Sequence, residues 1–233
     1  MFPDADPRLG DVWVHFRAGG PAFPTLDLEF VRQLLVELTT RAYPTPSATF
    51  PTVSADPGLV YTAGFSNGGG MVWQLLNSAL FSEFRGFTAV GKLLDPEKVR
   101  HYRRQLASAG TQPEPASVAY IHGTADRGYR PPFTLEEAEL DVTLPAFTMA
   151  EMLERNAIPS NAPATTQLVP GSNGVTEVVV QLFQATEAFL MATVINGGRN
   201  WPTPTTPGSP PVADHFDATA AIVRFSRQHA GLL

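Results

Sequence analysis

Short apolar segments alternate along this chain with longer amphipathic ones, which is the pattern of strands connected by helices. Three apolar runs predict strands, at residues 59–65 (LVYTAGF), 86–90 (GFTAV) and 116–123 (ASVAYIHG). Continuous apolar runs of this length are expected in a parallel sheet that is covered on both faces. Two further strands are predicted at residues 174–183 and 188–197.

Amphipathic stretches predict helices between these strands. A weakly alternating segment at 11–16 (DVWVHF) predicts a short strand. After it, from TLDLEF onward, apolar residues recur at helical spacing, which predicts a helix with Thr25 or Asp27 as its N-cap. A proline in the first turn and a terminal glycine delimit a helix from Asp95 to Gly110. Other helices are predicted at residues 68–81, 145–156 and 217–229, the last capped by Asp217.

Strands that alternate with helices imply an α/β fold, with a mostly parallel sheet and right-handed crossovers. The 233 residues suit one domain, 1–233. Residues 127–160 include a stretch of mixed polarity with several prolines, so this part is expected to form a lid or a long connection.

Composition excludes several classes of function. A net charge of −6 and the absence of a basic run argue against nucleic-acid binding. There are no cysteines, and the 5 histidines are scattered, so we expect no metal site and no cofactor. No apolar run reaches the ~20 residues that span a bilayer. The polar, acidic start does not resemble a signal peptide, so a cytoplasmic location is expected unless a leader has been removed.

The sequence TAGFSNGGGM contains G-x-S-x-G, formed by Gly64, Ser66 and Gly68, between a predicted strand and a predicted helix. This is the context of a nucleophile elbow, which lifts the serine above the carboxyl edge of the sheet. The amide of Asn67 would then supply half of an oxyanion hole. The alternative is a glycine-rich strand–helix turn without chemistry.

The stretch GFSNGGGM resembles the elbow of the polyhydroxybutyrate depolymerase and feruloyl esterase group of α/β-hydrolases, whose pattern is G-x-S-x-G-G-x-M. YIHGTADRGYRP resembles the group's H-G-T-x-D-x-x-V-P, and NGGRNWP resembles its G-G-G-H-x-W-P. LDLEFVRQLLVELTTRAY resembles the helix before the elbow strand. The resemblance covers roughly residues 24 to 230. It implies a serine esterase acting on acyl, hydroxycinnamoyl or polyester substrates.

The same resemblance places the acid of a catalytic triad at Asp126, which follows a predicted strand in the chain order Ser…Asp…His of this fold. Its role would be to orient and stabilise a protonated imidazole. The alternative is a loop aspartate that caps a turn. His122, at the end of a buried strand, is interpreted as structural, with its ring hydrogen-bonded to backbone.

Arg199 stands where the group has its general-base histidine, and arginine has no lone pair to accept a proton at neutral pH. His215 is the best substitute, because it lies between the last strand and the last helix. Three explanations remain open: His215 is the base, the chain is a hydrolase with impaired activity whose Arg199 pairs with Asp126, or position 199 has been altered. The histidines at 15, 101 and 229 are less well placed.

The front of the chain is the second departure from the group. Members have more strands before the elbow helix, and an H-G-x-x-G-like loop that donates the other oxyanion amide. HFRAGG (15–20) lies too close to the helix to be that loop in the usual register. Without those strands a sheet edge is exposed. We expect residues 11–16 or a partner subunit, as in a homodimer, to cover it.

Two tryptophans lie near the predicted site. Trp73 lies within the helix after the elbow and is expected to pack in the core, whereas Trp201 beside position 199 either lines the substrate cleft or packs. Two functions therefore compete: a serine carboxylesterase and a non-catalytic binding or interaction protein. A phosphate-binding loop is disfavoured, because the P-loop pattern G-x-x-x-x-G-K-[ST] is absent.

Overall fold

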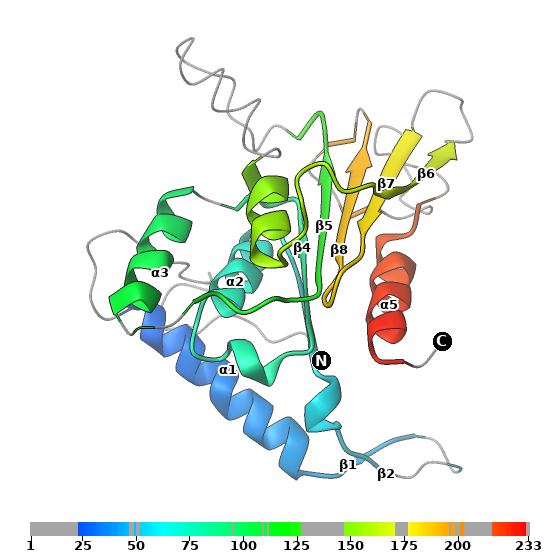
Figure 1. Cartoon of the computed structure of the whole chain (residues 1–233). Helices are drawn as coiled ribbons and strands as arrows, with labels where there is room; N and C mark the ends of the chain where they lie inside the picture. Colours follow the sequence, from blue (N-terminus) through cyan, green and yellow to red (C-terminus); the bar gives the residue numbers. More distant parts are fainter. Residues whose placement is uncertain are drawn as a thin grey trace.

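A computed structural model of the chain describes residues 23–46, 49, 52–94, 96–108, 110, 112–126, 147–170, 177–195, 197–198, 201–202 and 216–231. These residues form an α/β layout in which helices flank a six-stranded sheet (Figure 1). The strands of this sheet are β3 (Tyr61–Phe65), β4 (Gly86–Val90), β5 (Val118–Gly123), β6 (Thr165–Pro170), β7 (Glu177–Phe183) and β8 (Phe189–Val194).

The strand order across the sheet is β3-β4-β5-β8-β7-β6. Neighbours from β3 to β8 pair in parallel, whereas β7 is antiparallel to β8 and β6 is antiparallel to β7. The prediction of a mostly parallel sheet is therefore confirmed. The sequence did not indicate β6, because the polar stretch TTQLVP has no apolar pattern and five of its six residues are exposed; its place is set by pairing with β7.

Helices cover the two faces of this sheet unequally. One face carries α1 (Phe23–Thr40), α2 (Asn67–Leu76), α3 (Pro96–Ser108) and a helix over 147–155, and the other carries α5 (Ala218–His229) (Figure 1). The larger apolar core lies under the first group. Short elements complete the described chain: β1 (Tyr43–Pro44), β2 (Thr52–Val53), η2 (Pro57–Leu59) and η3 (Phe81–Glu83). No helix in the described ranges is long and apolar enough to cross a membrane.

The sequence predicted the start of α5 and the end of α3 correctly, but not the start of α1. The Asp217 side chain caps α5 by accepting from the amide of Ala220 at 3.0 Å, and Gly110 beyond α3 has a φ of +68°. The predicted N-cap at Thr25 or Asp27 is wrong, because α1 begins at Phe23 and contains both residues. Proline is compatible with the first turn of a helix, so Pro24 allows this earlier start.

Strand β3 differs from the expectation of a strand covered on both faces. None of its five residues is buried, and Ala63 is exposed, whereas every residue of β4 and β5 is buried. The reason is position, because β3 is the edge strand of the sheet formed by the described residues. The predicted strand at 11–16 lies outside those residues, as does most of the predicted lid.

Candidate active site

Ser66 occupies the junction between β3 and α2, as the G-x-S-x-G pattern predicts. Its backbone has φ 53° and ψ −113°, a conformation that costs free energy for any residue with a Cβ atom. Two hydrogen bonds hold it: the amide of Ser66 donates to the carbonyl of Val90 at 2.8 Å, and the amide of Gly70 donates to the carbonyl of Ser66 at 3.1 Å. The bend is therefore fixed from both sides.

Glycines around Ser66 permit this bend by close approach of backbone to backbone. A Cβ atom at Gly64 would lie 2.3 Å from the carbonyl carbon and oxygen of Gly68. A Cβ atom at Gly69 would lie 2.8 Å from the Cβ atom of Lys92, whereas one at Gly68 would meet nothing within 4 Å. Positions 64 and 69 thus require glycine for packing, and position 68 does not.

Helix α2 begins directly after Ser66, at Asn67. The amides of the first turn of a helix have no partner within the helix, and the helix dipole makes this end partially positive. A negative charge placed next to Ser66 would therefore be stabilised by this end of α2. The oxyanion role of the Asn67 amide stays a prediction.

Asp126 follows β5 and is 6% exposed. Its Oδ2 atom lies 3.7 Å from the position of a Cβ atom on Gly91, the residue after β4. The last residue of β4, Val90, is the one whose carbonyl accepts the amide of Ser66. Ser66 and Asp126 therefore flank the same end of β4, because the carboxyl ends of parallel strands meet at one edge of a sheet.

The loop that leads to position 199 lies against the loop that carries Asp126. The amide of Ala125 donates to the carbonyl of Gly197 at 2.8 Å, and the amide of Thr124 donates to the carbonyl of Val194 at 3.0 Å. A Cβ atom at Gly123 would lie 2.2 Å from the carbonyl oxygen of Gly197, so the approach requires glycine. This contact places Gly197, two residues before position 199, against the loop that carries Asp126.

Arg199 and His215 both lie outside the described residues, so neither candidate for the base position is placed. His15 lies outside them as well. His229 is placed at the opposite edge of the sheet, near Arg85 and Glu187, and burial lowers its pKa. It therefore cannot reach Ser66. This agrees with the expectation that His229 is less well placed than His215 to act as the general base.

Trp201 connects this edge of the sheet to α5. Its Nε1 atom donates to Oγ1 of Thr219 at 3.1 Å, and its ring meets the ring of Phe65 edge-on with centroids 6.4 Å apart. Phe65 directly precedes Ser66, so the two rings lie near the end of β3. The sequence predicts a role for Trp201 but not for Phe65 or Thr219, because neither of these belongs to a motif.

Two other predicted roles can be compared with the structure. Trp73 is 4% exposed and its Nε1 atom donates to the carbonyl of Lys92 at 2.7 Å, which confirms that it packs in the core. His122 is also buried, but its ring partner is the hydroxyl of Thr193 on β8, at 3.0 Å, rather than the expected backbone group. Burial lowers the pKa of His122 to about 4, so the ring is neutral at pH 7.

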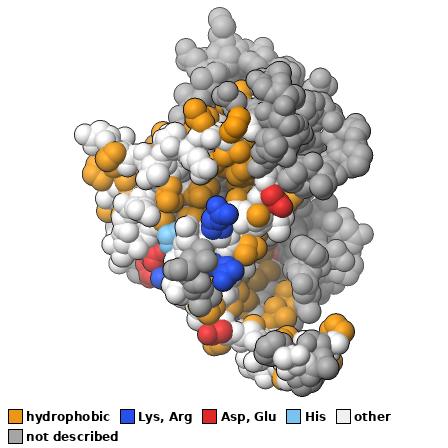
Figure 2. All heavy atoms as spheres, turned by 90° about the vertical axis from the view of Figure 1, so that its right-hand side faces the viewer, with side chains coloured by type: hydrophobic (Ala, Val, Ile, Leu, Met, Phe, Trp, Pro, Cys, Tyr) orange, Lys and Arg blue, Asp and Glu red, His pale blue; other side chains and the backbone are white. Residues whose placement is uncertain are grey.

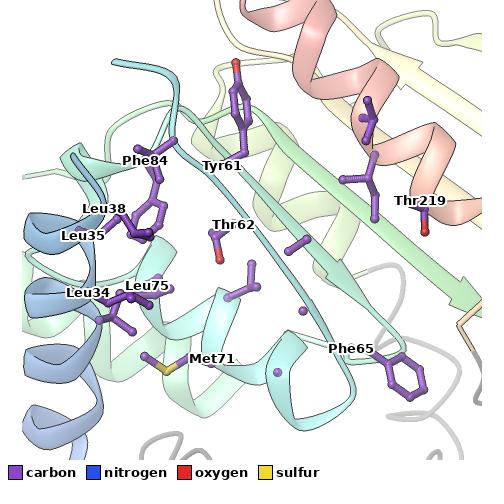
Figure 3. Close-up of a pocket in the computed structure, with 18 of the residues that line it drawn as sticks. Leu34, Leu35, Leu38, Tyr61, Thr62, Phe65, Met71, Leu75, Phe84 and Thr219 are labelled. Carbon is purple, nitrogen blue, oxygen red and sulfur yellow. The ribbon is translucent and has the colours of Figure 1, made fainter. Parts of the chain in front are cut away.

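An apolar groove of about 730 Å³ runs along β3, with α1 on one side and α5 on the other (Figure 3). One end of it lies near the junction of β3 and α2, at Phe65, Gly68 and Trp201. Hydrophobic side chains also gather over the described part of the face that carries α5 (Figure 2), where Val223 is 50% exposed. The sequence did not predict the groove, because its lining comes from α1, β3, α2 and α5, which are far apart in the chain.

Within the described ranges no group of three or more His, Asp or Glu side chains could hold a metal ion. No protein-family model matches the chain, and no curated protein matches it significantly.

Proposed function

We propose that this chain is a serine carboxylic-ester hydrolase that works through an acyl-enzyme at Ser66. The observation that carries the proposal is the strained backbone of Ser66, at φ 53° and ψ −113°, between β3 and α2. Strain of this kind persists only where the surrounding structure enforces it, and it is concentrated at functional sites. The buried carboxyl group of Asp126 beside the same strand end supports the assignment.

In the proposed reaction the general base takes the proton from the Oγ atom of Ser66, and this oxygen attacks the carbonyl carbon of the ester. The negative charge on the carbonyl oxygen is stabilised by the amide of Asn67 and by the N-terminus of α2. The alcohol leaves with a proton from the general base, and water then hydrolyses the acyl-enzyme. Asp126 orients that base, which we assign to His215.

The substrate class follows from the resemblance to the polyhydroxybutyrate depolymerase and feruloyl esterase group and from the surface beside the serine. Acyl, hydroxycinnamoyl and polyester groups are uncharged and largely apolar. The rings of Phe65 and Trp201 offer such groups an aromatic surface next to Ser66. Stacking on an aromatic ring favours the flat hydroxycinnamoyl group most.

A second function is supported by Arg199, which stands at the position of the usual histidine. An arginine side chain remains protonated and cannot take the proton of Ser66. If no histidine serves as base, the chain is a catalytically impaired binding or interaction protein of the same fold. In that case Arg199 forms an ion pair with Asp126 and binds or excludes carboxylates.

The nucleophile is tested by hydrolysis of p-nitrophenyl butyrate by the wild type and by Ser66→Ala. We expect Ser66→Ala to lower kcat/KM by about 10³-fold or more. Ser108→Ala, which changes an exposed serine at the end of α3, is the matched control and should not change the rate. Equal rates for the wild type and Ser66→Ala would contradict the hydrolase and support the binding protein.

The base is tested in the same assay with His215→Gln and Arg199→His. If His215 is the base, His215→Gln lowers kcat by about 10²-fold or more and Arg199→His has no comparable effect. A His215→Gln variant with wild-type activity would exclude His215. If Arg199→His alone then raises the rate at least about tenfold, the impaired hydrolase is the correct description.

A further inference from the structure

One row of residues crosses the sheet level with Ser66. The registers of β3 with β4 and of β4 with β5, continued by one residue, bring Gly91 between Ser66 and His122. On the far side of β5, His122 pairs directly with Thr193 of β8, the strand that lies next to β5 in Figure 1. His122 is also the last residue of β5 with a side chain, because Gly123 ends the strand. The final side-chain contact between β5 and β8 is therefore made at the level of Ser66.

The imidazole of His122 is held by few contacts. The side chain is buried, and its Nε2 atom lies 3.0 Å from Oγ1 of Thr193. Its Nδ1 atom is buried without a hydrogen-bond partner among the described residues. One face of the ring stacks on the ring of Tyr120, with centroids 5.0 Å apart and an angle of 1° between the planes. The hydroxyl of Thr193 is thus the polar group that fixes this ring in its plane.

The stack continues to the helix that follows Ser66. The ring of Tyr120 lies 5.9 Å from the ring of Trp73 on α2. The Nε1 atom of Trp73 donates to the carbonyl of Lys92, just beyond the end of β4, at 2.7 Å. We call the three rings of Trp73, Tyr120 and His122 the ring platform. It connects α2 and the end of β4 to β5, and the bond from His122 to Thr193 connects it to β8.

The loop that carries Asp126 begins directly after this contact. The amides of Thr124 and Ala125 both donate to carbonyl groups at or beyond the end of β8, at 3.0 and 2.8 Å. The amide of Asp126 donates back to the carbonyl of Gly123 at 3.3 Å, which closes a tight turn. Because two of its amides are bonded to the end of β8, this loop follows any shift of β8 against β5.

We propose that His122 and Thr193 are positioning residues that hold Asp126 in place relative to Ser66. The inference rests on the proposed function, in which Asp126 orients the general base. The hydrogen bond fixes β8 against β5 immediately before the acid loop, and the ring platform fixes β5 against the helix that begins after Ser66. His122 takes no part in proton transfer in this role; its ring is a rigid spacer with one polar contact.

The chemistry of the pair suits this role. A threonine hydroxyl can donate or accept a hydrogen bond, so it matches either tautomer of a neutral imidazole. Thr193→Val keeps the shape of the side chain but leaves the buried Nε2 atom without this partner. A buried polar group that loses its partner is strongly disfavoured. The ring should then move toward water and loosen the strand ends on which the acid loop depends.

Hydrogen exchange of single amides, followed by NMR, tests the contact without reference to activity. In Thr193→Val we expect the amides of Thr124 and Ala125 to exchange about fivefold faster or more, whereas the amide of Tyr120 should change less than about twofold. Thr193→Ser keeps the hydroxyl and should restore the wild-type rates. Unchanged rates for Thr124 and Ala125 in Thr193→Val would overturn the proposal.

A double-mutant cycle shows whether the effect passes through the imidazole. His122→Phe keeps a ring on Tyr120 but removes Nε2, so it should accelerate the same two amides. The double variant His122→Phe/Thr193→Val should exchange no faster than the faster single variant, because both changes remove one contact. Multiplication of the two effects would mean that the residues act independently and would overturn the pair.

Hydrolysis of p-nitrophenyl butyrate tests the catalytic consequence. Rates are normalised to the active sites that a fluorophosphonate labels at Ser66, which corrects for any loss of folded protein. We expect Thr193→Val to lower kcat about tenfold or more with KM within about twofold, and Thr193→Ser to recover most of the loss. Thr88→Val, which removes the hydroxyl of a buried threonine in the middle of β4, is the matched control and should keep the wild-type kcat.

The two measurements separate this inference from the proposed function. If the wild type hydrolyses no ester, the proposed function fails, and the exchange rates still decide whether the pair holds the loop of Asp126. If the wild type is active and Thr193→Val keeps its kcat per labelled site, the contact only stabilises the fold. The positioning role is then wrong, while the proposed function stands.

Discussion

A Cβ atom at Gly64 would lie 2.3 Å from the carbonyl carbon of Gly68, well inside van der Waals contact. The two residues begin and end the G-x-S-x-G pattern, yet only one of them needs to be glycine, because a Cβ atom at Gly68 would meet nothing within 4 Å. One close contact between the end of β3 and the start of α2 therefore explains the first glycine of the pattern but not the second.

Gly64→Ala should lower the free energy of unfolding by about 2–3 kcal/mol or more, because the new methyl group forces β3 and α2 apart. Gly68→Ala is the matched control, and should leave stability unchanged or raise it by up to about 1 kcal/mol through helix propensity. Urea denaturation followed by circular dichroism measures both. Equal destabilisation by the two variants would contradict the assignment of the contact.

The backbone strain at Ser66 predicts that the glycine variant at this position is more stable than the alanine variant. Ser66→Gly should be about 1 kcal/mol more stable than Ser66→Ala, because glycine adopts φ 53° and ψ −113° without the strain that a Cβ atom suffers. Both variants lack the hydroxyl, so the comparison is independent of any activity. Thermal denaturation of the two proteins is the measurement.

At Ser108, at the end of α3, we expect the opposite order of stability for the alanine and glycine variants. There alanine should be more stable than glycine by up to about 1 kcal/mol, because the site has helical geometry. If Ser66→Ala proves as stable as Ser66→Gly, the bend is not strained and the main support for a nucleophile elbow disappears.

Burial of His122 predicts a loss of stability in mild acid. Its pKa is lowered to about 4 in the folded chain and returns to its ordinary value near 6.5 on unfolding. Between these pH values the unfolded chain binds a proton that the folded chain does not. This stabilising contribution is therefore complete above pH 6.5 and is lost as the pH falls toward 4, by up to about 3 kcal/mol.

The measurement is the free energy of unfolding at pH 7.5 and at pH 4.5 for the wild type and for His122→Gln. Glutamine keeps a polar group near the hydroxyl of Thr193 but does not titrate. We expect the wild type to lose more stability than the variant over this interval. An equal loss in both proteins would show that His122 is accessible to protons in the folded state.

The buried side chain of Arg155 connects three segments of the chain. We therefore expect even Arg155→Lys, which keeps the positive charge, to destabilise the fold. Its side chain is 7% exposed and donates to the carbonyls of Glu114 and Leu76, at 2.7 and 3.1 Å, and to Oδ1 of Asn77 at 3.1 Å. A lysine cannot reproduce this fork of donors. Arg155→Lys should therefore destabilise the fold by about 2–4 kcal/mol.

Arg104→Lys is the control for that change, because Arg104 is exposed on α3 and its Nε atom donates to the carbonyl of Arg100 in the same helix. It should alter the free energy of unfolding by less than about 0.5 kcal/mol. Urea midpoints at pH 7.5 distinguish the two variants. Similar midpoints would mean that the buried contacts of Arg155 contribute little.

The sequence alone was sufficient where local rules act. The strand 86–90 appears with the predicted bounds, Asp217 caps α5, and Ser66 lies between a strand and a helix as its glycine-rich context requires. These features depend on residues within a few positions of each other. Side-chain capping, steric freedom of glycine and the continuity of apolar runs determine them before any long-range contact forms.

Only the tertiary structure decided how deeply each strand is buried and which distant segments come together, because both depend on the neighbours of an element. LVYTAGF is as apolar as the runs that became β4 and β5, yet β3 is half-exposed, because burial is set by what lies beside a strand and not by its composition. The polar stretch of β6 joined the sheet through pairing with β7. The approach of Asp126 to the end of β4, and of Gly197 to Ala125, likewise required the sheet to bring together segments that are distant in the chain.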